Sequence, residues 1–104
     1  MIERRSATRI LVSFHVTFRS IALGKQEGMI SDLAVNGSRL ESLAPMAVNS
    51  YLQLWIKVSP TLPRILVDLA AVRWVRDGQA GIEFLSLRPE YKTELEQIME
   101  ELPE

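Results

Sequence analysis

The sequence contains no cysteine and only one histidine among its 104 residues. Without cysteine, the chain cannot form a disulfide, hold a metal through thiolates or use a thiol as a nucleophile. A single histidine also excludes any metal site that needs two imidazole ligands. No apolar run approaches the roughly 18 residues that span a bilayer, and the polar N-terminus is unlike a signal peptide, so we expect a cytoplasmic protein without membrane insertion.

The chain also lacks a large net charge of either sign. Twelve Lys and Arg residues against thirteen Asp and Glu residues leave a net charge of −1. This balance argues against a DNA or RNA polymer as partner, because such binding depends on many phosphate contacts. The charge is uneven, however, since three arginines occur in the first nine residues and six glutamates follow Pro89. Any anion site must therefore be local, and the basic end is the N-terminus.

Alternating apolar residues predict that the chain is all-β. Between Arg9 and Arg19 apolar and polar residues alternate strictly, which is typical of a strand with one buried face. Five further segments have strand-like patterns, so we expect about six antiparallel strands; these segments are 27–33, 38–43, 51–58, 64–76 and 80–85. In the longest of them the alternation loses its phase at Ala70 and Ala71, which predicts a β-bulge.

Two dipeptides predict tight hairpin turns between these strands. Asn36-Gly37 and Asp77-Gly78 each stand between strand-like segments. Both dipeptides favour such turns, because Asn, Asp and Gly tolerate positive φ.

A change of periodicity near the end of the chain predicts a helix. After Pro89 the apolar residues recur at spacings of three and four, which indicates an amphipathic helix over residues 88–103. Short strands, hairpin turns and one helix, without a βαβ rhythm, favour a small antiparallel barrel over residues 10–87. At this length we expect residues 1–104 to form one domain.

An arginine-rich segment, residues 1–9, precedes the first strand. It contains Arg4, Arg5 and Arg9. A guanidinium keeps its charge at any working pH, bridges phosphate oxygens through its planar fork of donors and stacks on bases. Because polar chain ends are commonly poorly ordered, we expect a flexible arm. The alternatives for this arm are a solvated basic tail and a site for a phosphorylated, planar ligand.

Asp32 provides a second candidate site, in the segment SDLAVNG. On a barrel, an arm that precedes the first strand can fold back over such a hairpin. The Asp32 carboxylate can then accept hydrogen bonds from the N1–H and exocyclic amine of a guanine, while a guanidinium of the arm contacts O6 and N7. The alternative interpretation is an Asx-turn, in which the Asp side chain accepts a hydrogen bond from a nearby backbone N–H.

The two motifs together make the sequence resemble the PilZ domain family. The RxxxR pattern of that family is matched by Arg5 and Arg9, and its D/NxSxxG pattern is approached by the segment from Asp32 to Gly37. The segment AVRWVRDGQAGIEF, which contains Trp74, is similar to the A-V-x-W to G-I-x-F end of PilZ barrels. The resemblance covers essentially the whole chain and implies a six-stranded, split antiparallel β-barrel with one C-terminal α-helix.

The resemblance also implies a bacterial receptor for the second messenger cyclic di-GMP that relays the signal to a downstream protein. In that picture Arg5 and Arg9 hold phosphates and guanines, and Arg4 adds a further contact. Asp32 contacts a guanine edge, and Gly37 lets the hairpin backbone approach the ligand. The remaining candidate site residues are Ala34, Asn36 and Trp74.

Ala34 is the departure from the pattern, because the family has serine at this position. A hydroxyl hydrogen bond contributes about 0.5–1.5 kcal/mol, so the resemblance implies weaker binding rather than none. Ser38 offers a substitute hydroxyl, although strand alternation directs it differently from residue 34. Trp74 is explained equally well by packing.

Two further functional classes were compared with the receptor hypothesis. The main alternative is a degenerate PilZ-like adaptor that has lost the nucleotide and acts through protein–protein interaction. An enzyme is the least supported class, because no convincing pair of acid, base or nucleophile can be assembled from the sequence. We therefore expect no cofactor or metal other than the nucleotide ligand. The sequence does not identify the downstream partner.

Overall fold

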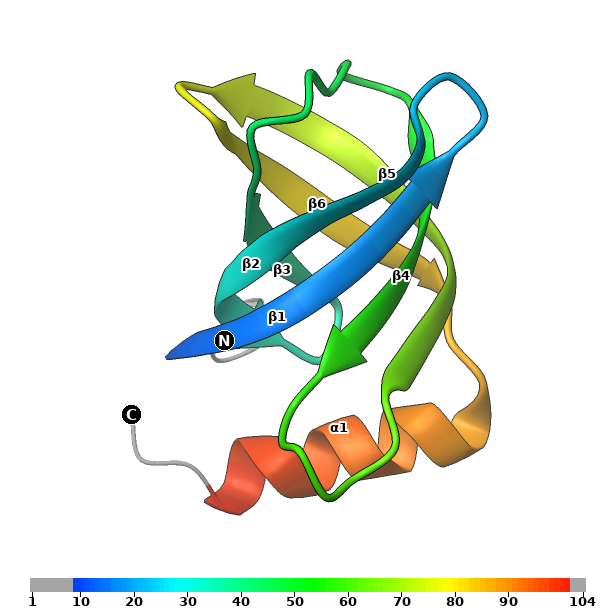
Figure 1. The fold of residues 1–104 in the computed structure, drawn as a ribbon. Coiled ribbons are helices and arrows are strands. Elements are labelled where there is room, and N and C mark those ends of the chain that lie inside the picture. The colour runs from blue at the N-terminus through cyan, green and yellow to red at the C-terminus, as the bar shows by residue number, and fades with distance from the viewer. Residues whose placement is uncertain (1–8, 102–104) are drawn as a thin grey trace, which may run out of the picture.

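The computed structural model describes residues 9–101, which form six strands and one helix (Figure 1). The elements are β1 (Ile10–Ser20), β2 (Gly24–Ala34), β3 (Gly37–Glu41), β4 (Tyr51–Lys57), β5 (Ile65–Arg76), β6 (Gln79–Ser86) and α1 (Pro89–Glu101). The predicted all-β fold with one C-terminal helix is therefore confirmed. The predicted flexible arm, apart from Arg9, and the last predicted residues of the helix lie outside the described residues.

The strands are all antiparallel and close into a barrel in the order β1-β2-β3-β6-β5-β4. Two meanders, β1-β2-β3 and β4-β5-β6, supply three strands each. They are joined by the pairs β1 with β4 and β3 with β6. Each of the six described strands is thus paired on both sides, which removes the free edges that promote association of sheets.

Register shifts adjust which side chains face the core. In β1 the pairing with β2 shifts between Leu11 and Phe14, but the predicted alternation of buried and exposed residues holds from Ile10 to Val16 and ends only at Thr17, which is buried. In β5 the pairing with β6 shifts between Leu69 and Ala70. Ala70 and Ala71 are both fully buried, so the predicted bulge in this strand is confirmed.

The helix α1 packs across one end of the barrel, the lower end in Figure 1. Leu95 and Ile98 are buried and belong to the same core cluster as the inward side chains of the strands. These two residues have the spacing that the amphipathic pattern predicts. Within residues 9–101, no helix is both long and apolar enough to cross a membrane.

The two predicted hairpin turns differ in their backbone geometry. Asp77 and Gly78 have φ values of 49° and 79°, as a tight turn with positive φ at both residues requires. The hairpin between β2 and β3 also forms, but its two turn residues are Val35 and Asn36. The turn was therefore misplaced by one residue, and neither Asn36 nor Gly37 has a positive φ.

Gly37 is instead required by the close approach of two strands. It is the first residue of β3 and is paired with Glu83 of β6. A Cβ atom at this position would collide with the carbonyl oxygen of Ile82. The glycine thus allows β3 and β6 to meet at the distance that closes the barrel.

We expect the substitution Gly37→Ala to lower the free energy of unfolding by about 1–3 kcal/mol, because the added methyl group collides with backbone that cannot rotate away. Denaturant-induced unfolding measures this loss. The substitution Asn36→Ala, at an exposed position of the same turn, is the control and should change the unfolding free energy far less. An equal loss for the two variants would contradict the steric explanation.

Candidate functional site

One line of paired residues runs across the wall of the barrel. Asp32 in β2 is paired with Arg39 in β3, Arg39 with Gly81 in β6, and Gly81 with Trp74 in β5. Directly paired residues project from the same face of a sheet. Trp74 is 39% exposed, so that face is the outer one. These four residues form what we call the cross-strand row.

Asp32 is a nearly buried carboxylate that lies between two arginines. Its side chain is only 10% exposed. Nη1 of Arg9 donates a hydrogen bond of 2.9 Å to Oδ1, whereas Nε of Arg39 lies 3.8 Å from Oδ2, which is too far for a hydrogen bond. The Asx-turn interpretation is wrong, because Asp32 lies within β2 and its carboxylate accepts its hydrogen bond from Arg9.

Trp74 packs against Gly81 of β6 and has two guanidiniums near its ring. A Cβ atom at Gly81 would collide with the indole ring, so this glycine makes room for the tryptophan. The guanidinium carbons of Arg39 and Arg76 lie 5.9 and 6.0 Å from the ring centroid, within the range of cation–π attraction. Trp74 is therefore a packed residue that still exposes part of its ring.

Three adjoining hollows surround Trp74, with volumes of about 230, 140 and 400 Å³. Their charged lining residues are Arg9, Arg39, Arg73, Arg76, Asp32 and Glu83. Arg73 is paired with Glu83 at 2.6 Å, and Arg9 is hydrogen-bonded to Asp32. The lining thus holds more guanidiniums than carboxylates, although the whole chain has a net charge of −1. A surface of this kind favours anions.

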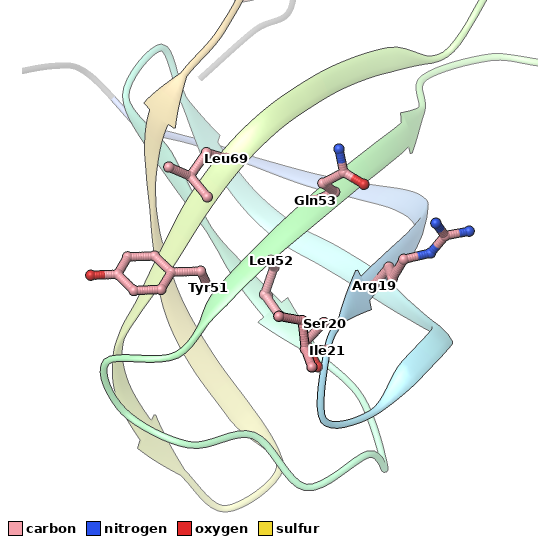
Figure 2. Close-up of a pocket in the computed structure, with 7 residues that line it drawn as sticks. All are labelled: Arg19, Ser20, Ile21, Tyr51, Leu52, Gln53 and Leu69. Carbon is pink, nitrogen blue, oxygen red and sulfur yellow. The ribbon is translucent and has the colours of Figure 1, made fainter.

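A fourth hollow, of about 290 Å³, has a different character. It lies between the end of β1, the start of β4 and Leu69 in the interior of β5, and Figure 2 shows the side chains of Ile21, Tyr51, Leu52 and Leu69 around it. Arg19 is its only charged lining residue. It lacks the pairing of a carboxylate with guanidiniums that is present around Trp74. Among residues 9–101, no group of three or more acidic or histidine residues is placed to hold a metal ion.

The structure brings four of the predicted site residues together. Arg9, Asp32, Asn36 and Trp74 all line the hollows around the tryptophan. Ala34 and Gly37 are paired with each other beside these hollows, and Ala34 is fully buried. Arg4 and Arg5 lie outside the described residues, so their predicted contacts are not described by the structure.

Ser38 does not replace the missing serine at position 34. It is paired with Leu33 and Ile82, which are both core residues, and is only 1% exposed. Its hydroxyl has no hydrogen-bond partner among the described residues. The burial of its hydroxyl agrees with the alternation of the strand, but Ser38 also lines the hollow that Asp32 and Arg9 line.

Several residues of this face were not predicted from the sequence, among them Arg39, Arg73, Arg76 and Gly81. Arg73 and Arg76 are close to Trp74 in the sequence, and alternation from Trp74 places Arg76 on the same outer face. For Arg39 the signal is weaker. It lies two residues after Gly37, and only the true position of the turn pairs it with Asp32.

The chain is a small all-β domain. It is a closed six-stranded barrel that one helix covers at one end, and arginines line part of its outer face. The chain belongs to the PilZ domain family, whose model matches residues 3–101. This match confirms the family that the sequence motifs indicated.

Solved structures share the fold. The Bacillus subtilis inhibitor of motility MotI/DgrA has a TM-score of 0.77 and 16% identity, with 93% of this chain and 50% of that chain covered. YcgR from Escherichia coli in complex with c-di-GMP has a TM-score of 0.77 and 16% identity, with 94% of this chain and 45% of that chain covered. This chain therefore spans about half the length of either protein.

A third structure matches this chain over nearly its full length. The PilZ domain of Escherichia coli YcgR with c-di-GMP has a TM-score of 0.73 and 16% identity, and the match covers 96% of this chain and 92% of that one. Identities this low establish the fold alone. No curated protein matches the chain.

The contact between Gly81 and Trp74 predicts a spectroscopic change. We expect the substitution Gly81→Ala, made in a Trp55→Phe background, to displace the Trp74 ring outward and shift its fluorescence emission to longer wavelength, because the new methyl group would occupy the place of the indole. The Trp55→Phe protein alone is the reference. Unchanged emission in a folded Gly81→Ala variant would contradict the described packing of Trp74.

Proposed function

We propose that this chain is a receptor for cyclic di-GMP that binds the nucleotide over the cross-strand row and relays its presence to another protein. The observation that carries the proposal is the pairing of Arg9 with the nearly buried Asp32, beside the partly exposed Trp74. These three groups supply complementary chemistry for a guanine nucleotide. Membership in the PilZ family and the nucleotide bound to YcgR support the choice of cyclic di-GMP.

The carboxylate of Asp32 provides selectivity for guanine. Guanine presents two adjacent donors, N1–H and the exocyclic amine, which suit the two oxygens of an ionised carboxylate. Adenine has no such pair of donors on its Watson–Crick edge. A base that binds Asp32 competes with Arg9 for Oδ1, so Arg9 has to move when the ligand enters.

The arginines provide attraction for the phosphates and the opposite edge of the base. Once released from Asp32, Arg9 can donate to guanine O6 and N7 or to a phosphate oxygen. Arg4 and Arg5 are proposed to add further contacts from the arm, as the RxxxR motif suggests. The exposed part of Trp74 offers an apolar surface for the base or ribose.

Ala34 affects the affinity rather than the mode of binding. Its methyl group supplies no hydrogen bond where the family motif has a hydroxyl. The contribution lost is about 0.5–1.5 kcal/mol, whereas each charged guanidinium contact contributes about 1.5–3 kcal/mol. The retained arginines therefore outweigh the missing serine.

The second candidate function is an adaptor that binds a protein and no nucleotide. The observation in its favour is that Arg9 and Asp32 satisfy each other without any ligand. Calorimetric titration with cyclic di-GMP, with GTP and cyclic AMP as controls, separates the two functions, because the adaptor gives no heat of binding.

We expect the substitution Arg9→Ala to weaken cyclic di-GMP binding at least about tenfold, since it removes a charge-assisted contact of about 1.5–3 kcal/mol. Arg5→Ala should have an effect of similar size. Calorimetry gives the affinities, and melting curves verify the folded state. The control is Arg88→Ala, which breaks an exposed ion pair with Asp68 away from the hollows around Trp74. Unchanged affinity in the folded Arg9→Ala protein would exclude this face as the binding site.

A further inference from the structure

Among the described residues 9–101, Asp32 has two guanidinium neighbours, and one of them forms a hydrogen bond with it. Arg9 donates to Oδ1 at 2.9 Å, while Nε of Arg39 lies 3.8 Å from Oδ2. The Nε atom of Arg39 is buried and has no hydrogen-bond partner among the described residues. A vacant donor and a second carboxylate oxygen therefore face each other just beyond bonding distance.

The position of Arg39 is held from two sides. Its backbone is paired with Asp32 in β2 and with Gly81 in β6, so the strand register fixes where its side chain begins. Its guanidinium lies 5.9 Å from the centroid of the Trp74 ring. Arg9 has no comparable support from strand pairing, because it precedes the first residue of β1. Of the two neighbours of Asp32, Arg9 is the one that is free to leave.

A carboxylate that is 10% exposed cannot be left without a partner at low cost. Removal of one member of a buried ion pair typically costs several kcal/mol, because the remaining charge is neither hydrated nor paired. If Arg9 leaves Asp32, a movement of about 1 Å brings the carboxylate within hydrogen-bond distance of Nε of Arg39. This exchange keeps the carboxylate of Asp32 paired with a guanidinium.

We propose that Arg39 is a positioning residue that takes over Asp32 when Arg9 moves to the ligand, and so holds the carboxylate in place for the guanine edge. The proposal rests on the proposed function for its ligand. Arg39 acts through Asp32 and is not required to touch the nucleotide. Selectivity for guanine then depends on Arg39 as well as on the arginines of the family motif.

A stability cycle tests the exchange without any ligand. The proteins are wild type, Arg9→Ala, Arg39→Met and the double variant, compared by denaturant-induced unfolding. Each single variant leaves Asp32 one guanidinium, so we expect small losses. The double variant leaves none, and its unfolding equilibrium constant should rise at least about tenfold beyond the product of the single effects.

The same cycle in an Asp32→Asn background is the control for that experiment. Asparagine carries no charge to neutralise, so the excess loss in the double variant should disappear. Independent effects of Arg9 and Arg39 in the wild-type background, or an equal excess in the Asp32→Asn background, would overturn the exchange.

A selectivity measurement tests the positioning role. The probes are cyclic di-GMP and cyclic di-inosine monophosphate, which lacks the exocyclic amine and so offers Asp32 one donor fewer. We expect wild type to prefer the guanine ligand and Arg39→Met to reduce that preference at least about fivefold, because an unsupported carboxylate meets both donors less well. Arg39→Lys should restore the preference only in part, since its ammonium lacks the planar fork.

Arg76→Met is the matched control for the selectivity measurement. Arg76 lies over the same ring as Arg39, at 6.0 Å, but does not contact Asp32. If Arg39 acts only by covering Trp74, the two Met variants will change the affinities for both probes alike and leave the preference unaltered. That result would overturn the positioning role while the proposed function stands. If wild type binds no cyclic di-GMP, the proposed function fails, and the stability cycle then decides alone whether Arg39 holds Asp32.

Discussion

The pairing of β3 with β6 is the constraint on which both the barrel and its candidate site depend. This pair joins the two meanders, and the backbones meet so closely that Gly37 has no room for a Cβ atom against Ile82. Two positions further along β3, Arg39 is paired with Gly81, whose missing side chain makes room for Trp74. We call this β3–β6 pairing the seam. Gly37, in β3, allows the barrel to close, and Gly81, in β6, makes room for the tryptophan.

The seam also explains the distribution of charge. Asp32 and Arg39 come from the first meander, and Trp74 and Arg76 come from the second. Closure of the barrel therefore brings the guanidiniums of Arg39 and Arg76 close to the indole ring of Trp74. Like charges gathered in this way repel one another. The repulsion is offset here by the carboxylate of Asp32 and by the face of the tryptophan. The result is a locally cationic surface on a chain whose total charge is slightly negative.

Much of the fold could be predicted from the sequence, because its signals are local. Alternation gave the strands, and Asp77-Gly78 gave a turn whose positive φ values the structure confirms. The other turn was misplaced by one residue, because the glycine of Asn36-Gly37 is required by a distant strand and not by the turn itself. Propensity for positive φ carries no information about such tertiary contacts.

The candidate site was predictable only in part, because some of its residues belong to local sequence motifs and others are defined by tertiary contacts. Arg9, Asp32 and Trp74 were identified from motifs, and the structure places them around the same hollows. Arg39 was missed, because its importance comes from partners in three strands rather than from any pattern around it. The burial of Ala34 and the inward direction of Ser38 likewise depend on register.

The pairing of β3 with β6 has a consequence for the order in which the molecule assembles. Asp32 and Arg39 belong to the β2–β3 hairpin, and Trp74 and Gly81 belong to the β5–β6 hairpin, so each half of the cross-strand row forms through contacts that are local in sequence. The β3–β6 pairing joins segments that are distant in sequence, and its formation therefore loses more loop-closure entropy. The complete row exists only after that closure. A ligand that touches both hairpins binds the closed barrel and not the open chain, and at one hundred times its dissociation constant it stabilises closure by about 2.7 kcal/mol. Ligand concentration would thus set the free energy of opening the β3–β6 pair, and hydrogen exchange at the β3 and β6 amides would report it.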